Sequence, residues 1–119
     1  MGYVSGLVTV SSVDEARAIA GALVAERLAA CANVIPGVES TYWWNGAIET
    51  SAEVIVLLKT RAELTDAVIR RVRELHSYEC PCVVFAEIVA GSAPFIAWIG
   101  EETREPRDAE GEEVDFRGH

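Results

Sequence analysis

The sequence predicts an α+β fold of the ferredoxin-like (split βαβ) type, with two helices on one face of an antiparallel four-stranded sheet. Two segments repeat apolar residues at helical spacing, and four others are rich in β-branched and aromatic residues. An Asn45-Gly46 pair joins the second strand to the third. Half of the 119 residues are hydrophobic, which is enough for one core. We therefore expect one domain over residues 1–104.

The first strand, residues 3–9, leads into a helix. Ser12 followed three residues later by Glu15 is a capping-box pattern, which marks a helix start. Residues 16–30 then carry an apolar stripe at helical spacing. Arg27 falls on that stripe, so we expect it to reach the rim or to pair with a carboxylate.

A long central hairpin is predicted next, with arms at residues 31–44 and 47–59. Pro36-Gly37 predicts a bend or bulge in the first arm. The arms are longer than ordinary strands and carry aromatic side chains near the tip: Tyr42, Trp43 and Trp44. Unless the aromatic residues fold back under the chain's own tail, such a hairpin must pair with other copies, and we expect Trp43 and Trp44 in that interface.

Thr60 and Glu63 form a second capping-box pattern, and apolar residues then line one face of a second helix up to Leu75. Residues 82–90 are the predicted fourth strand. A short helix begins near Pro94, with an apolar face formed by Phe95, Trp98 and Ile99. Residues 105–119 are acidic and are expected to form a flexible tail.

Composition excludes several classes of function. The net charge is −9, with no basic stripe, which argues against nucleic acid and anionic membranes as partners. No apolar run is long enough to span a membrane. Three cysteines and an apolar core predict a reducing cytoplasm as the location. The sequence lacks a Gly-rich phosphate loop, a GxSxG elbow and an HExxH motif, so no enzyme and no organic cofactor is predicted.

The segment from His76 to Cys82 carries the densest chemistry, with an imidazole and two thiols, Cys80 and Cys82, beside a carboxylate. Imidazole and thiolate are ligands that zinc and copper prefer. Cys31 lies at a second helix-to-strand corner. These residues are candidate metal ligands, but two structural alternatives remain open. Cysteines are often buried core residues, and His76 is placed to cap the end of its helix.

Glu53 and Lys59 lie on the same face of the third strand, because they are an even number of positions apart, six along the strand. They are too far apart to contact each other within one strand. We expect them to line a cleft between subunits together with Tyr42, Tyr78 and His76.

Several segments, in this order and spacing, resemble the CutA family, which is named for divalent-cation tolerance. The matching residues are 26–34, Pro36-Gly37, Ser40, Tyr42, Trp44, Gly46, Glu53, Leu58-Lys59-Thr60 and 76–81. The family motif usually reads His-Pro-Tyr-Glu-x-Pro-Glu, whereas this chain has Ser77 for the first proline and Cys82 for the last glutamate.

The resemblance implies a ferredoxin-like subunit and a homotrimer in which the long hairpins complete neighbouring sheets. It also implies tolerance of copper and other divalent metals, with copper or zinc as the bound ion. As a ligand, Cys82 would shift the metal preference of the site towards Cu(I) or Zn(II). Equally, the replacement of glutamate by cysteine fits a position whose role is purely structural. Because the family is similar in architecture to the trimeric PII signalling proteins, the alternative is a regulatory module that binds a small anionic ligand in the inter-subunit cleft.

Overall fold

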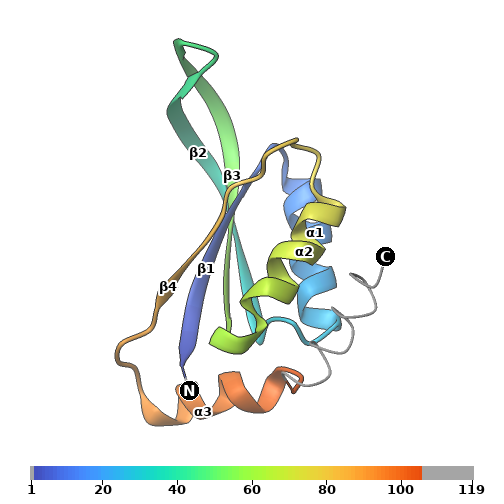
Figure 1. The fold of residues 1–119 in the computed structure, drawn as a ribbon, viewed down its shortest axis with the longest axis vertical. Helices are drawn as coiled ribbons and strands as arrows, with labels where there is room; N and C mark the ends of the chain where they lie inside the picture. Colours follow the sequence, from blue (N-terminus) through green and yellow to red (C-terminus); the bar gives the residue numbers. More distant parts are fainter. Residues whose placement is uncertain (1, 106–119) are drawn as a thin grey trace.

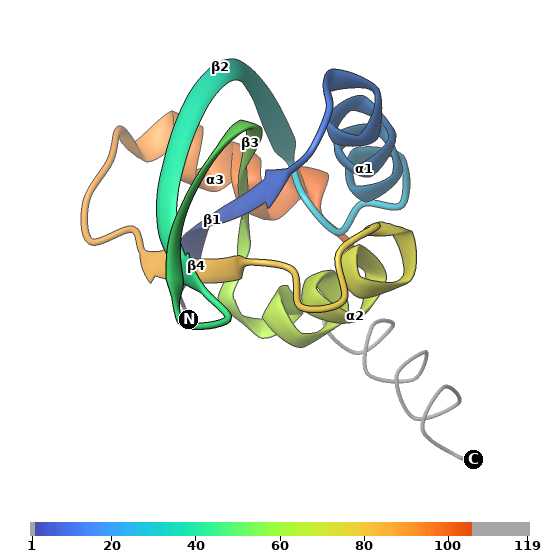
Figure 2. The same ribbon diagram turned by 90° about the horizontal axis from the view of Figure 1, so that it is seen from above.

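The computed structural model describes residues 2–105 and confirms the predicted α+β, ferredoxin-like fold (Figure 1). The elements are β1 (Tyr3–Val10), α1 (Val13–Ala25), β2 (Cys31–Trp44), β3 (Ala47–Arg61), a 3₁₀ turn (Ala62–Leu64), α2 (Thr65–Leu75), β4 (Val83–Glu87) and α3 (Ala93–Glu102). The strands form one antiparallel sheet in the order β2-β3-β1-β4. Helices α1 and α2 cover one face, and α3 lies across the end where β1 begins (Figures 1 and 2).

The core lies between the sheet and the helices α1 and α2. Side chains alternate across a strand, so every second residue of β1 and β3 points toward the helices. These positions are filled by β-branched or leucine side chains, which pack against apolar residues of both helices. The fully buried members include Val8, Val10, Val56 and Leu58 from the sheet, Ile19 and Leu23 from α1, and Val68 and Val72 from α2.

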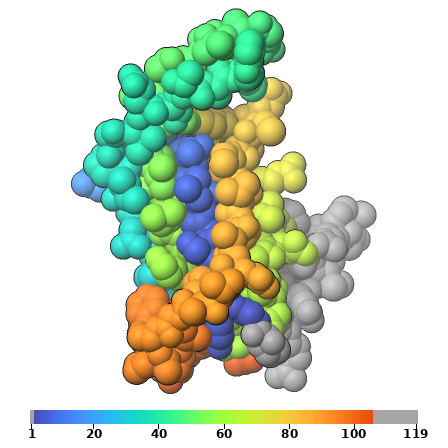
Figure 3. Space-filling view, turned by 90° about the vertical axis from the view of Figure 1, so that its left-hand side faces the viewer, coloured from blue at the N-terminus to red at the C-terminus, as the bar shows by residue number. Residues whose placement is uncertain are grey.

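The opposite face of the sheet is also apolar, but no described element covers it. Leu7 of β1 is paired in register with Leu57 of β3 and Val84 of β4, which together form an apolar row across the sheet. Val84 remains 56% exposed. Figure 3 shows β3, β1 and β4 side by side at this surface. An apolar open face of this kind is a surface on which another chain could pack.

The long hairpin extends well beyond the rest of the sheet (Figure 1). Asn45 and Gly46 both have positive φ, as the predicted tight turn requires. The predicted bulge also occurs, with a register shift between Ile35 and Val38, and Gly37 at φ +80°. Pro36 is tolerated there because β2 is an edge strand.

The second capping box is a wrong prediction. Thr60 lies within β3, and its hydroxyl donates a hydrogen bond to the Leu28 carbonyl oxygen at 2.7 Å. The helix begins at Thr65, after the 3₁₀ turn, and it has no side-chain cap. A Thr-x-x-Glu pattern marks a helix start only where the threonine is free to bond the next turn, and here tertiary structure uses its hydroxyl instead.

Two element boundaries and the apolar face of the last helix also differ from prediction. The first helix ends at Ala25 because Arg27 takes a φ of 60°, which a right-handed helix cannot continue. From there Arg27 pairs with Glu102 at 2.9 Å, so the predicted carboxylate partner is confirmed. Strand β4 is only Val83–Glu87, since its pairing with β1 ends there. Phe95 is 42% exposed, which makes Ile99 the buried anchor of α3.

The tail at residues 106–119 lies outside the described residues, so the predicted boundary after residue 104 stays a prediction.

Candidate functional site

A pocket of about 680 Å³ lies where the hairpin curves over the end of β1, beside the loop between α2 and β4 (Figure 3). Its walls combine aromatic rings, two carboxylates, a thiol and the hydroxyls of serines and threonines. The residues on which its chemistry depends are Tyr42, Trp44, Glu53, Tyr78, Glu79 and Cys80. Among the residues that the structure describes, no basic side chain lines it.

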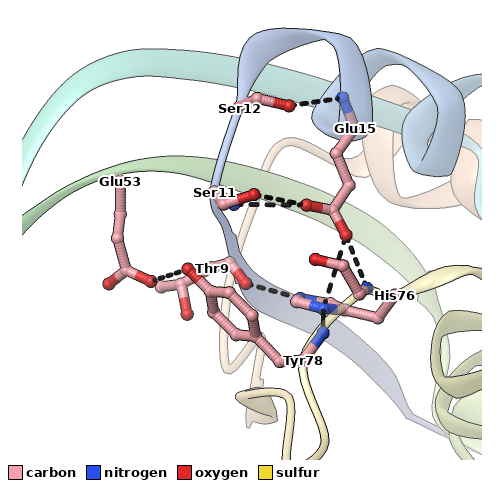
Figure 4. A network of polar contacts seen from close by, with 8 residues as sticks. Thr9, Ser11, Ser12, Glu15, Glu53, His76 and Tyr78 are labelled. Atoms are coloured by element: carbon pink, nitrogen blue, oxygen red, sulfur yellow. Dashed lines mark hydrogen bonds and ion pairs between the residues drawn. The ribbon is translucent and has the colours of Figure 1, made fainter.

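Glu53 lies on the open face of β3, opposite Val38 and directly after the bulge in β2. It is only 9% exposed. Its Oε2 accepts a hydrogen bond of 2.9 Å from the hydroxyl of Tyr78 (Figure 4). The pKa of Tyr78 is raised to about 12, first by burial and then by this hydrogen bond to a carboxylate. Tyr78 is therefore a neutral hydrogen-bond donor over the physiological pH range.

His76 does not line the pocket but contacts the backbone of Tyr78, which does. Its Nε2 lies 2.7 Å from the Thr9 carbonyl oxygen, and the Tyr78 backbone N–H donates to its Nδ1 at 3.0 Å (Figure 4). In this pair of contacts Nε2 is the donor to Thr9 and Nδ1 is the acceptor from Tyr78, and Nδ1 also lies 3.5 Å from Glu15 Oε2. The side chain is fully buried, and both nitrogens are engaged. Ligation of a metal by His76 would require one of these bonds to break, so in this arrangement the imidazole positions Tyr78.

Glu15 fixes the start of the same loop. Its Oε2 accepts the Ser77 backbone N–H at 2.7 Å, and its Oε1 accepts from the N–H and the hydroxyl of Ser11. Burial raises the pKa of Glu15, but the hydrogen bonds from Ser77 and Ser11 outweigh it, so the net pKa is lowered. The predicted N-cap is confirmed, because the Ser12 hydroxyl accepts the Glu15 N–H at 3.1 Å. The carboxylate, however, bonds Ser11 rather than Ser12.

The three cysteines are free and lie in different surroundings. Cys31 begins β2 and is partly buried, in register with Lys59. Cys80 is exposed at the pocket wall, and Cys82 is exposed just before β4. Within residues 2–105 there is no group of three or more His, Cys, Asp or Glu side chains that could hold a metal ion.

The structure thus gathers some of the predicted site residues and separates others. Tyr42, Glu53 and Tyr78 meet in the pocket, where Cys80 joins them. Lys59 does not line the pocket, because it lies six positions further along the extended strand, about 20 Å from Glu53. Trp44, which was predicted only as an interface residue, lines the pocket. Trp43 points to the other side of the hairpin and is 71% exposed.

Sequence reasoning missed Glu15 and Glu79. Glu79 could have been found, since it lies inside the motif that was singled out. Glu15 contacts a residue 62 positions away, and no local pattern signals that contact.

Comparison with known proteins supplies the family. The family model described as CutA1 divalent ion tolerance protein matches residues 4–102. Protein CutA 1, chloroplastic, from rice (Oryza sativa) is 40% identical over 82% of this chain and 55% of its own length. The divalent-cation tolerance protein CutA of Thermus thermophilus is 41% identical over 82% of this chain and 94% of its own.

A solved structure agrees with the fold. The CutA of Archaeoglobus fulgidus, described as a periplasmic divalent cation tolerance protein, is 36% identical, with a TM-score of 0.83 over 86% of this chain and 99% of that one. The chain spans about half the length of the rice relative.

These relatives correct the predicted cytoplasmic location, which is wrong as an inference from composition. The rice protein is named chloroplastic and the Archaeoglobus protein periplasmic. An odd number of cysteines and a core that needs no disulfide are compatible with several compartments, so they do not select one. None of the helices within residues 2–105 combines the length and hydropathy that crossing a bilayer requires.

Proposed function

We propose a cation-binding role for this chain, which belongs to the CutA1 divalent ion tolerance protein family. In this proposal a homotrimer binds copper or another divalent metal ion and so contributes to cation tolerance. The observation that carries it is the pocket under the curved outer part of the hairpin, where carboxylates and a thiol line the walls and no described basic side chain does. Its role is binding rather than catalysis.

The proposed metal ligands lie at the mouth of the pocket, in the loop before β4. Cys80 and Glu79 both line the pocket, and Cys82 follows two residues later. Thiolates favour Cu(I), Zn(II) and Cd(II) over hard ions such as magnesium. Because one subunit does not gather a full ligand set within its described residues, the remaining ligands would come from a second subunit.

Two surfaces support assembly. The open face of the sheet carries the apolar row of Val84, Leu7 and Leu57. The hairpin tip carries Trp43 beside Ile48, which are 71% and 62% exposed. Two such patches on one subunit would be covered if each hairpin lay against a neighbouring sheet. The number three comes from the resemblance to the family.

The alternative of a small anionic ligand is less well supported by the pocket. An anion site gathers basic groups or a helix N-terminus. Lys59 and Arg61 lie toward the far end of β3, and the Arg61 guanidinium already bonds the Gly100 carbonyl oxygen and the Thr103 hydroxyl.

Metal titration of the chelator-stripped protein tests the proposal. Zn(II), Cd(II) and Cu(I) are titrated by calorimetry into the parent, Cys80→Ser, Cys82→Ser and Cys31→Ser proteins at one pH. Loss of a true ligand should weaken binding by roughly tenfold or more. We expect that loss for Cys80→Ser and Cys82→Ser. Cys31→Ser serves as the matched control and should bind as the parent does. Equal affinity in all four proteins would contradict the site.

A further inference from the structure

We propose that the same pocket binds a small organic cation of the ammonium class. This goes beyond metal binding and does not depend on it, because it rests on Glu53 and the aromatic walls rather than on the thiols at the mouth. Three observations carry it: a buried carboxylate with no cationic partner among the described residues, aromatic side chains that line the same pocket, and a volume far larger than a metal ion.

The first observation is the state of Glu53. This carboxylate is 9% exposed, and within residues 2–105 it forms no ion pair. Its one hydrogen-bond donor among the described residues is Tyr78, which bonds Oε2. A buried anion is costly unless a cation or several donors compensate it. Glu53 lines the pocket and its Oε1 has no hydrogen-bond donor among the described residues, so an ammonium group in the pocket would supply that compensation.

The second observation is the aromatic wall. Tyr42, Trp44 and Tyr78 all line the pocket, and a hydrogen-bond contact of 3.1 Å with the Ser51 hydroxyl holds Tyr42 in place. Aromatic rings attract ammonium groups through the negative face of the π system, most strongly for tryptophan. Aromatic residues combined with a carboxylate form the usual recognition chemistry for an ammonium ligand.

The third observation is size. The pocket volume of about 680 Å³ lies within the range typical of small-molecule sites. A metal ion at the mouth would leave the aromatic walls and Glu53 without a ligand. The net charge of −9 adds a long-range attraction for cations of any kind.

The test compares choline with its neutral carbon isostere, 3,3-dimethylbutanol, which has the same shape without the charge. Both are titrated by calorimetry into the full chain in its native oligomeric state, and intrinsic tryptophan fluorescence is followed in parallel. Choline should bind at least about tenfold more tightly than the isostere, since only the cation gains from the carboxylate and the rings.

Two variants locate the site. Glu53→Gln keeps an acceptor for Tyr78 but removes the charge, and it should weaken choline binding by about tenfold. Trp44→Leu removes one ring and should weaken it by about threefold or more. Glu39→Gln is the matched control, because it removes one negative charge from an exposed position on the same hairpin outside the pocket. It should bind choline as the parent does.

Equal binding of choline and the isostere would overturn the proposal, as would unchanged affinity in Glu53→Gln. Thermal melts and sedimentation confirm that each variant is folded and assembled. If Glu53→Gln fails to fold, Trp44→Leu decides the question, because Trp44 is 55% exposed and its replacement leaves the core intact. Choline binding that survives in Trp44→Leu without loss would refute the aromatic site. Metal affinity is measured separately, so failure here leaves the metal proposal standing.

Discussion

Replacing Ser77 by proline should destabilise the protein through Glu15. The Ser77 backbone N–H donates to Glu15 Oε2 at 2.7 Å, and proline has no N–H to donate. A hydrogen bond to a charged group contributes about 1.5–3 kcal/mol. Proline also restricts the unfolded chain, which offsets about 0.4–1 kcal/mol of the loss. We therefore expect Ser77→Pro to lower the free energy of unfolding by about 0.5–2.6 kcal/mol.

Chemical denaturation at one protein concentration measures the effect. Ser77→Ala is the matched control, since it keeps the backbone donor. In a Glu15→Ala background, Ser77→Pro should not lower the free energy of unfolding, because the carboxylate that accepts the Ser77 N–H is already absent. The double-mutant cycle therefore isolates the Ser77–Glu15 hydrogen bond.

The effect of Ser77→Pro should also depend on pH. The pKa of Glu15 in the folded protein lies below its ordinary value of 4.5, so its stabilising effect is present above that value and is lost as the pH falls through the folded-state pKa. The difference in free energy of unfolding between Ser77→Pro and Ser77→Ala should therefore decrease as the pH is lowered from about 6 to about 3. Equal stability of Ser77→Pro and Ser77→Ala at neutral pH would refute the reasoning.

Further predictions concern Tyr78, Thr60 and the assembly. Tyr78 should be the last tyrosine to ionise in an ultraviolet absorbance titration, and stability should fall as pH rises from about 10 toward 12, since the unfolded chain releases that proton first. Phe in place of Tyr78 should abolish the late phase. Thr60→Val should cost about 1–3 kcal/mol in denaturation, because it leaves the Leu28 carbonyl buried without its donor, whereas Thr50→Val at an exposed site should cost little. Analytical ultracentrifugation at submicromolar concentration should show a trimer, and a monomer there would contradict the proposed assembly.

The fold could be predicted from sequence because its signals are local. Asn45-Gly46 defines the hairpin turn, Pro36-Gly37 defines the bulge, and apolar residues at helical spacing define the helix faces that pack on the sheet. The prediction failed at Thr60, where a local capping pattern is present but a contact with Leu28, 32 positions away, uses the hydroxyl.

The site could be predicted only in part. Tyr42, Glu53 and Tyr78 were placed in one cleft because the resemblance and the strand face both pointed there, and the structure brings them together. Lys59 shares that face but lies too far along the strand. The engagement of both His76 nitrogens depends on Thr9 and Tyr78 backbone atoms, whose positions are fixed by packing and not by residue type.

The measurement that tests the central claim most directly is cadmium-113 NMR of the chelator-stripped protein loaded with one equivalent of the isotope per subunit. The chemical shift of this nucleus distinguishes thiolate from oxygen-only ligation. We predict a signal in the thiolate region that is unchanged in Cys31→Ser and moves upfield, toward the oxygen-ligand region, in Cys80→Ser and in Cys82→Ser, because each of these variants loses one thiolate. A signal confined to the oxygen-ligand region, or one unchanged in Cys80→Ser and Cys82→Ser, would contradict a metal site at the mouth of this pocket.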